Sequence, residues 1–386
     1  MFTSIHSDIK DTVTISARRF EQSPYYDQYV NDATVMGAYA GRYYPVFNGE
    51  DPVATYWNLR RKVVLYDVPE KPWQIEGPDV VPFLERVFAR RVGDLKQDRA
   101  RYAIACAPDG GVFMDGILFR LADEQYWFVQ PDGALEAWLI AMSEGYDVRI
   151  SDPHSRVLQI QGPLSGAVMS SLADGATDRL GYFHAGHFDI NGQQLYVSRT
   201  GWTGEVGYEI YSGGASTDHA RLWTDLVAAG EAQGMSFGSI SSMELRRIEA
   251  GILDNLTDFD LTMTPFAAGL ADFIDLDKEG FVGRDALLQA DRRPRLYGLT
   301  CSGSTPDYQG AVFQDGVPVG WVTAAAWSPS LECGIGYVRF TEPGDWLGDT
   351  VSVETSDGAT VPASVVPLPF LDPEKRIPRG LDTKVP

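Results

Sequence analysis

The chain of 386 residues carries 53 acidic and 32 basic residues, and this net charge of −21 argues against a nucleic-acid surface or an anionic membrane as its main partner. No apolar run reaches the roughly 18 residues of a membrane span, and no signal peptide is visible. Three scattered cysteines favour a reducing, cytoplasmic setting over a disulfide framework, and the length allows two or three domains.

The first half of the chain predicts two related strand–helix units. A helix is expected over residues 52–62 and a short buried strand over residues 63–67. Residues 73–78 (Trp-Gln-Ile-Glu-Gly-Pro) resemble residues 158–163 (Leu-Gln-Ile-Gln-Gly-Pro), and each copy predicts a strand that ends at Gly-Pro before a helix. This duplication suggests two related α+β subdomains.

The remaining elements indicate mixed structure followed by an all-β region. The Pro-Asp-Gly-Gly turn at residues 108–111 predicts a β-hairpin. Asp218 can cap a helix that stops at Gly230, and another helix is expected over residues 241–250. From about residue 293 onward, short strands and Gly-Pro turns predict a separate all-β C-terminal domain.

Residues 198–211 predict a strand, a glycine-rich turn and a second strand. Gly201, Gly204 and Gly207 recur at every third position, which permits tight turns and close approach of a ligand to the backbone. Alternation in the second strand places Glu209 and Tyr211 on one face. A carboxylate beside an aromatic ring can hold a flat polar heterocycle, and the alternative is an ordinary hairpin with a solvent-facing Glu209.

Patterns of several common active sites are missing from the sequence. His184 and His187 form an H-x-x-H pair ahead of a strand, but further metal ligands are not evident and no metal site is predicted. There is no nucleotide-binding loop, and no Ser-His-Asp or Cys-His set stands out.

Short motifs follow one another in a specific order along most of the chain. They are residues 66–68, 75–78, 110–112 with Asp115, 160–163, 200–205, 207–210, 247–251, 264–265, 281–287, 320–323 and 328–331. In this order they resemble the aminomethyltransferase (glycine-cleavage T-protein) superfamily of tetrahydrofolate-dependent one-carbon transferases, from about residue 18 to about residue 369. The resemblance implies tetrahydrofolate as the cofactor.

The fold implied by this resemblance is an α+β cloverleaf of three domains around a central folate channel. Residues 1–60 and 150–250 are expected to form a discontinuous folate-binding α+β domain. Residues 61–149 and 251–290 are expected to form the second α+β domain, and residues 291–386 a C-terminal β-barrel-like domain.

Departures from the family pattern bear on the reaction. Met114 stands where the family has the first of two adjacent acids, Pro69-Glu70 replaces a Ser-His pair, and Met243 replaces an arginine. Aminomethyl transfer from a protein-bound lipoyl arm is therefore disfavoured. The leader with Arg18-Arg19-Phe20 and residues 75–79 are closer to the folate-dependent demethylases, such as dimethylsulfoniopropionate demethylase.

Site residues are carried over from the resemblance, with Glu209 as the acceptor of the pterin N–H groups. The residues implied to bind the cofactor are Tyr102, Asp115, Val129, Glu209, Arg247 and Trp327, those implied to be catalytic are Asp115 and Tyr211, and those expected to bind the substrate are Tyr25, Tyr44 and Trp202. Ordinary structural roles are the alternatives: an ion pair of Arg247 with Glu249 or Glu244, a core position for Trp327, and backbone hydrogen bonds for Asp115.

The predicted reaction moves a methyl group from a small sulfonium or ammonium donor to N5 of tetrahydrofolate. The leaving group departs neutral, so the protein mainly has to align the reactants, and aromatic faces can hold the cation. Arg18, Arg19 or Arg42 can pair with a substrate carboxylate, with exposed solvation as the alternative. A homodimer is a possible assembly.

Three other functions stay open at this point. An aryl methyl ether donor would need an acid for the leaving phenolate, and Tyr211 or Tyr208 could supply the proton. Aminomethyl transfer on the same fold is a second option. A folate-binding accessory protein without catalytic activity is a third.

Overall fold

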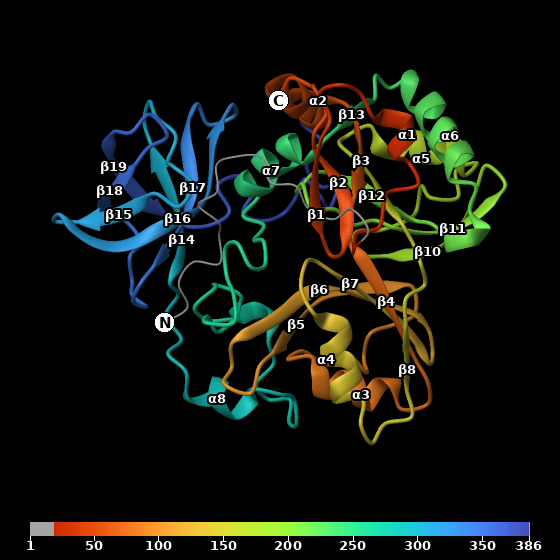
Figure 1. Cartoon of the computed structure of the whole chain (residues 1–386), viewed down its shortest axis with the longest axis horizontal. Coiled ribbons are helices and arrows are strands. Elements are labelled where there is room, and N and C mark those ends of the chain that lie inside the picture. The colour runs from red at the N-terminus through yellow and green to blue at the C-terminus, as the bar shows by residue number, and fades with distance from the viewer. Residues whose placement is uncertain (1–18, 386) are drawn as a thin grey trace.

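Two β-sheets and a closed barrel organise residues 19–385, the part of the chain that this computed structural model describes (Figure 1). Predictions that involve residues 1–18, Arg18 among them, lie outside the described residues. The first sheet has the strand order β10 (Ala185–Ile190), β11 (Gln193–Ser198), β12 (Gly207–Tyr211), β9 (Val157–Gln161), β3 (Val64–Val68) and β13 (Ser236–Gly238). Its strands pair antiparallel, except that β13 runs parallel to β3.

The second sheet is antiparallel and lies below the first in Figure 1. Its order is β5 (Arg99–Cys106), β6 (Val112–Ala122), β7 (Gln125–Gln130), β4 (Lys71–Glu76) and β8 (Arg149–Ser151). Helices α3 (Val80–Val87) and α4 (Leu135–Met142) cover one face and bury Phe83, Leu84 and Leu139 against it. The predicted hairpin at residues 108–111 is confirmed, since it joins β5 to β6.

Helices cover the first sheet on both sides. The core under α5 (Ser165–Leu172) and α6 (His219–Glu231) contains Val168, Leu222 and Leu226. The predicted helices at 52–62 and 241–250 are confirmed as α2 (Pro52–Arg61) and α7 (Ile240–Glu249), which contact each other. The shorter elements are α1 (Tyr26–Tyr29), the hairpin of β1 (Val35–Tyr39) and β2 (Arg42–Phe47), α8 (Arg284–Gln289), and two 3₁₀ turns at Gly214–Ser216 and Ala271–Phe273.

The predicted all-β C-terminal domain is confirmed as a closed six-stranded barrel. Its strand order is β14 (Leu296–Cys301), β17 (Cys333–Phe340), β16 (Val317–Ser328), β15 (Ala311–Gln314), β18 (Thr350–Glu354) and β19 (Thr360–Val366). Helix α7 packs against β16 and β17, which joins the barrel to the first domain.

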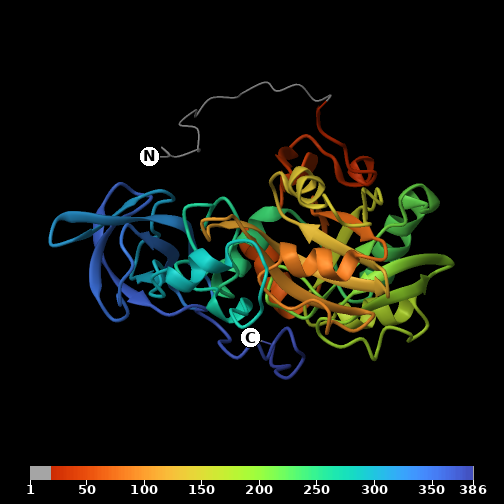
Figure 2. The ribbon, with the colours of Figure 1, turned by 90° about the horizontal axis from the view of Figure 1, so that it is seen from below.

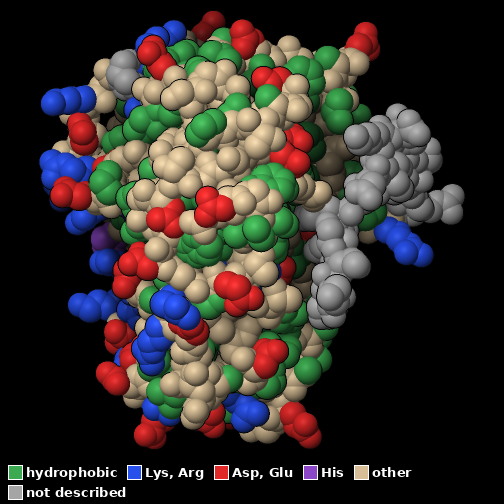
Figure 3. All heavy atoms as spheres, turned by 90° about the vertical axis from the view of Figure 1, so that its left-hand side faces the viewer, with side chains coloured by type: hydrophobic (Ala, Val, Ile, Leu, Met, Phe, Trp, Pro, Cys, Tyr) green, Lys and Arg blue, Asp and Glu red, His purple; other side chains and the backbone are tan. Residues whose placement is uncertain are grey.

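Acidic and basic side chains are interspersed on the side of the molecule that Figure 3 presents.

The internal repeat predicted from the two Gly-Pro motifs is present as β4–α3 and β9–α5. Gly77 and Gly162 follow the two strands with φ of +135° and +123°. A Cβ at Gly77 would lie 2.4 Å from the carbonyl oxygen of Asp147, and one at Gly162 would lie 2.5 Å from that of Lys62. The glycine in each copy is therefore required by the backbone that crosses it.

The predicted domain boundary at residue 61 differs from the strand pairing. Strand β3 pairs with β9 and β13, so residues 64–68 belong to the first sheet and not to the second. The buried run Val64-Leu65-Tyr66 is hydrophobic on both faces, which suits a central strand, but sequence alone does not tell which sheet it joins.

A C-terminal segment, residues 367–385, leaves the barrel and returns along the other two domains (Figure 2). The backbone N–H of Leu371 donates to the carbonyl of Glu249 at 3.0 Å. Further along, Arg199 donates to the carbonyl of Pro378 at 3.2 Å. These contacts hold the segment beside the glycine-rich turn of residues 200–206.

Asp218→Ala is expected to lower the free energy of unfolding by about 1 kcal/mol. The Asp218 carboxylate accepts from the backbone N–H of Arg221 at 3.0 Å and so caps helix α6, as predicted. Denaturant unfolding measures the loss, and Glu231→Ala, an exposed position at the other end of this helix, is the matched control. A loss no greater than that of the control would contradict the cap.

Candidate active site

A cavity of about 1220 Å³ lies between the two sheets. Its wall comes from the β3–β4 turn, strands β5, β6, β7 and β12, the glycine-rich turn, the start of α7, residues 251–257 and the C-terminal segment. Pockets for small molecules and cofactors usually lie in such clefts between structural units, and this volume admits a ligand of drug size or larger.

Glu209 projects from β12 into this cavity with both carboxyl oxygens hydrogen-bonded. Oε2 accepts from the hydroxyls of Ser198, Thr200 and Tyr211 at 3.3, 2.6 and 2.6 Å, and Oε1 accepts from the amide of Gln159 at 3.0 Å. Burial raises the pKa of Glu209, and the three hydroxyl donors oppose this rise. The solvent-facing alternative is wrong because Glu209 is 8% exposed. Oε1 keeps the capacity to accept from a ligand.

The glycines of the turn before Glu209 make room for a side chain. A Cβ at Gly201 or at Gly207 would lie 2.2 Å from Oε1 of the buried Gln161. The amide of Gln161 donates to the carbonyl of Thr200 at 3.2 Å and accepts from the hydroxyl of Thr203 at 2.7 Å. The space beside the backbone of Gly201 and Gly207, predicted to admit a ligand, is occupied by the side chain of Gln161. Gln161 thereby fixes the turn that precedes Glu209.

Asp115 faces the same cavity from β6. Its Oδ2 accepts from the hydroxyl of Tyr102 at 2.7 Å, and its Oδ1 accepts from the amide of Asn255 at 3.0 Å. Burial raises its pKa to about 6. Met114, the neighbour that replaces a family acid, points to the opposite face of the strand and packs in the core under α3 and α4. That departure therefore leaves the acidity of the cavity wall unchanged.

Other predicted residues meet at this cavity as well. Tyr102, Val129, Tyr44 and Trp202 all line it, and their roles toward cofactor and substrate stay predictions. Tyr211 does not line it, because its hydroxyl is directed to Glu209, and burial raises its pKa well above the usual range. The predicted role of Tyr211 as an acid is thus replaced by one of positioning Glu209.

Two predicted residues lie elsewhere, which corrects their assignment. Tyr25 is fully buried and packs its ring against those of His219 and Trp223, at centroid distances of 5.4 and 5.9 Å. Trp327 lies on β16 with 41% of its surface exposed, so it neither closes the cavity nor belongs to the barrel core. Tyr208, the second predicted proton donor, packs in the core of the first domain.

Arg247 supports the cavity wall from behind. Its guanidinium pairs with Asp258 and with Glu244, each at 2.5 Å, so the predicted pairing with Glu244 is confirmed and that with Glu249 is not found. The same group lies 5.1 Å from the ring centre of Trp202, which lines the cavity. Arg247 is buried and acts through Trp202 and the loop that holds Asp258.

Several residues of the cavity wall carry no functional signal in the sequence. Acidic ones are Glu70 and Asp254, whose pKa burial raises to about 8 and about 7. Lys375 and Arg379 come from the C-terminal segment. In the sequence, Glu70 stood out only as a departure from the family pattern and not as a cavity residue. The others were not visible, because they reach the cavity through tertiary packing.

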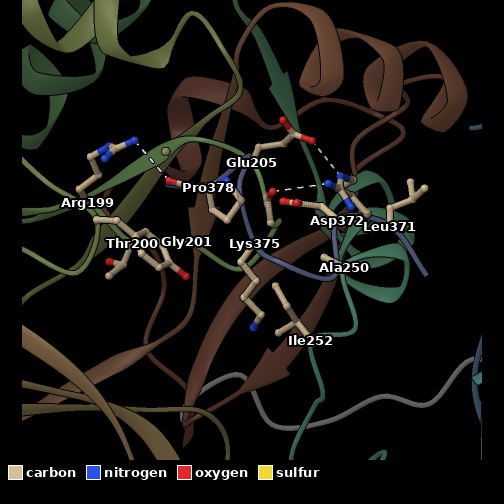
Figure 4. Close-up of a pocket in the computed structure, with 14 residues that line it drawn as sticks. Arg199, Thr200, Gly201, Glu205, Ala250, Ile252, Leu371, Asp372, Lys375 and Pro378 are labelled. Atoms are coloured by element: carbon tan, nitrogen blue, oxygen red, sulfur yellow. Dashed lines mark hydrogen bonds and ion pairs between the residues drawn. The ribbon is translucent and has the colours of Figure 1, made fainter. Parts of the chain in front are cut away.

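A smaller cavity of about 30 Å³ lies beneath the C-terminal segment (Figure 4). Figure 4 shows Pro378 on the same side as Thr200 and Gly201, and the side chain of Lys375 extended toward Ile252. Lys375 contributes to both cavities, so the segment forms a shared wall.

Two family models match the chain. The GCVT N-terminal domain matches residues 25–278, and the Glycine cleavage T-protein C-terminal barrel domain matches residues 295–372. The chain belongs to the aminomethyltransferase family. As a member of this family it is an enzyme. Residues 373–385 of its C-terminal segment lie beyond the matched barrel domain.

The relatives of this chain are named for two different activities. The aminomethyltransferase of Streptomyces coelicolor is 33% identical over 316 residues, which cover 78% of this chain and 84% of that protein. Dimethylsulfoniopropionate demethylase DmdA of Ruegeria pomeroyi is 30% identical over 310 residues, with coverage of 78% and 84%.

Likeness to a solved structure shows the same fold. Glycine cleavage system aminomethyltransferase T from Bartonella henselae superposes with a TM-score of 0.81 at 24% identity, covering 91% of this chain and 98% of that one. Within residues 19–385, no helix is long and apolar enough to cross a membrane. The described residues also hold no cluster of three or more His, Cys, Asp or Glu suited to a metal ion.

Glu70→Gln is expected to stabilise the protein at about pH 9 and to have little effect at about pH 5. Burial and the charge of Glu209 raise the pKa of Glu70 from 4.5 to about 8, so between these values the folded state holds a proton that the unfolded state has lost. Rising pH therefore costs the wild type stability, on the order of 1 kcal/mol for this half-buried group, and glutamine avoids this cost.

Denaturant unfolding at both pH values tests this expectation. Glu136→Gln, an exposed position on α4, is the matched control and should change stability equally at both. An effect of Glu70→Gln that does not depend on pH would contradict the raised pKa.

Proposed function

We propose that the protein is a tetrahydrofolate-dependent demethylase that moves a methyl group from a small sulfonium or ammonium donor, with dimethylsulfoniopropionate as the first candidate, to N5 of tetrahydrofolate. The observation that carries this proposal is the buried carboxylate of Glu209 at the cavity wall. Its hydroxyl donors fix its orientation, and Oε1 is left able to accept from the pterin N–H groups.

The residues of the cavity fit the cofactor chemically. Glu209 would hold the pterin edge, and Val129 and Tyr102 would flank the ring system. Tetrahydrofolate supplies N5 as the nucleophile. Lys375 and Arg379 offer positive charge for the glutamate carboxylates of its tail.

Asp115 is the residue suited to accept the proton that N5 loses. In such a displacement the carbon–sulfur or carbon–nitrogen bond of the donor would break with its electron pair on the leaving atom, and the methyl carbon would bond to N5 of a folate held by Glu209. The leaving group departs neutral, so only the N5 proton has to be removed. With a pKa of about 6, Asp115 is ionised at neutral pH, and Tyr102 and Asn255 hold its two oxygens in place.

The protein mainly contributes alignment and exclusion of water in this reaction. Side chains from both sheets, the loop after α7 and the C-terminal segment line the cavity. Holding two reactants in line accounts for a large part of the rate enhancement in such displacements. Tyr211 and Tyr208 are both engaged away from the cavity, which disfavours an acid-assisted reaction on an aryl ether.

Aminomethyl transfer is the second candidate, favoured by the named activity of relatives such as the Streptomyces coelicolor protein. One panel of donors distinguishes the two. The protein is incubated with tetrahydrofolate and, separately, with dimethylsulfoniopropionate, glycine betaine, dimethylglycine, vanillate and an aminomethylated lipoyl carrier protein, and the folate products are identified by mass.

Formation of 5-methyltetrahydrofolate with a sulfonium or ammonium donor is the expected result. Turnover of the lipoyl carrier alone would establish the second candidate, and turnover of vanillate alone would establish the aryl ether reaction. Folate binding without turnover of any donor would indicate an accessory protein, and no folate binding would overturn the cofactor assignment.

A further inference from the structure

Glu70 places an unsatisfied carboxyl oxygen in the cavity wall. The residue lies in the turn between β3 and β4, and its backbone carbonyl accepts from Arg42 at 2.8 Å, which fixes the turn. Its Oε2 is buried and has no hydrogen-bond partner among the described residues. A buried carboxyl oxygen in this state costs free energy unless a ligand satisfies it.

Asn255 presents a second unsatisfied acceptor to the same cavity. Only 3% of the residue is exposed, and its amide nitrogen donates to Asp115 at 3.0 Å. Its Oδ1 has no partner among the described residues. Next to it along the chain, Asp254 also lines the cavity. The loop after α7 thus brings the unpartnered Oδ1 of Asn255 and the carboxyl group of Asp254 to the cavity wall.

Two tyrosines complete this part of the wall. Tyr39 and Tyr44 pack edge to face with ring centres 6.1 Å apart, and both line the cavity. The hydroxyl of Tyr39 points to Asp254 at 3.4 Å, a weak contact. Burial, together with the charges of Asp254 and Glu70, raises the pKa of both tyrosines.

The two arginines that act on Glu70 and Asp254, Arg42 and Arg247, are themselves held by other partners. Arg247 is paired with Asp258 and Glu244, and Arg42 is engaged by Glu21 and by two backbone carbonyls. Arg42 therefore does not serve a substrate carboxylate, which was one expectation from the sequence. Asp132 also lines the cavity and adds a carboxyl group, whereas Glu244 is paired with Arg247. The basic residues that line the cavity wall are Arg90, Arg99, Arg101, Lys375 and Arg379.

We propose that Tyr39, Tyr44, Glu70, Asp254 and Asn255 form an onium subsite, the part of the cavity that binds the cationic group of the methyl donor. The proposal rests on the proposed function and names the residues that select its substrate class. Aromatic faces and carboxyl oxygens together are the groups that recognise a sulfonium or quaternary ammonium. The polarised methyl hydrogens of such a cation also suit the amide oxygen of Asn255.

Selection by charge has a consequence for product release. The donor is positive before methyl transfer, and the sulfide or tertiary amine that remains is neutral. The onium subsite attracts the first and not the second, so the demethylated product is held more weakly than the substrate.

The test compares each cation with its uncharged carbon isostere by calorimetry in the presence of tetrahydrofolate at about pH 9, where Glu70 and Asp254, with pKa values of about 8 and about 7, are both ionised. Dimethylsulfoniopropionate is paired with 4-methylpentanoate, and glycine betaine with 3,3-dimethylbutyrate. The wild type is expected to prefer at least one cation over its isostere by about tenfold or more. Glu70→Gln and Asp254→Asn, which keep shape and remove charge, are each expected to reduce this preference to about threefold or less. Glu136→Gln is the control and should keep it.

The outcomes separate this inference from the proposed function. Equal affinity for cation and isostere in the wild type, no binding of either cation, or a preference that survives both substitutions would overturn the onium subsite. Folate binding of each variant, measured in the same samples, verifies that it is folded. If the wild-type protein itself did not bind folate, the proposed function would be overturned instead.

Discussion

Glu209→Gln is expected to weaken tetrahydrofolate binding at least about a hundredfold and to abolish methyl transfer. The carboxylate would accept a pterin N–H group at Oε1, and a hydrogen bond to a charged group contributes about 1.5–3 kcal/mol. A glutamine amide would also place its own N–H groups against the donors that surround this site, the hydroxyls of Thr200 and Tyr211 and the amide of Gln159. Titration calorimetry with tetrahydrofolate measures the loss.

Tyr208→Phe is the matched control for Glu209→Gln. It lies next to Glu209 on the same strand, and its side chain points to the opposite face, into the core of the first domain. Folate affinity should stay within about threefold of the wild type in this control. If Glu209→Gln bound folate as tightly as the control, Glu209 would not hold the cofactor.

Arg247→Met is expected to lower the free energy of unfolding by about 3–5 kcal/mol. The substitution removes the only ion-pair partner found for Asp258 among the described residues and leaves this fully buried carboxylate uncompensated. Trp202, which rests on the guanidinium, would also lose support at the cavity wall. Chemical denaturation measures the free energy of unfolding. Titration of the folded protein with folate shows whether the loss of support for Trp202 also weakens folate binding.

A double-mutant cycle with Asp258→Asn tests the cause of this loss. Because the double variant leaves no unpaired charge, it should be more stable than Arg247→Met alone, with a coupling energy of at least about 1 kcal/mol. Additive losses would mean that Arg247 stabilises the protein by packing and not through Asp258.

Much of the fold was predictable because local patterns and tertiary structure agree. The Gly-Pro repeats mark two strand–helix units, since in both copies a crossing backbone leaves no room for a Cβ. The Pro-Asp-Gly-Gly turn and Asp218 act locally, so their sequence signals were sufficient. The place of β3 was not predictable, because a strand that is apolar on both faces fits the centre of either sheet.

The candidate site was predictable only where strand alternation decides the direction of a side chain. Glu209 and Tyr211 share a face of β12, and their contact follows from that period of two. Tyr25 and Trp327 are aromatic residues whose direction depends on what packs beside them. Neither the aromatic character of Tyr25 nor the family resemblance at Trp327 was enough to place them.

Residues that complete the cavity come from segments far apart in the chain. Glu70, Asp254 and Arg379 meet only because the β3–β4 turn, the loop after α7 and the C-terminal segment converge on one cavity. Their sequence neighbourhoods carry no motif for this convergence.

Transfer of an isotopically labelled methyl group tests the central claim most directly. Dimethylsulfoniopropionate and glycine betaine with fully deuterated methyl groups are each incubated with the wild-type protein and tetrahydrofolate, and the folate is analysed by mass. The proposed function predicts 5-methyltetrahydrofolate that carries the intact labelled methyl group from at least one donor, and none with Glu209→Gln. Bound folate that stays unlabelled with both donors would contradict it.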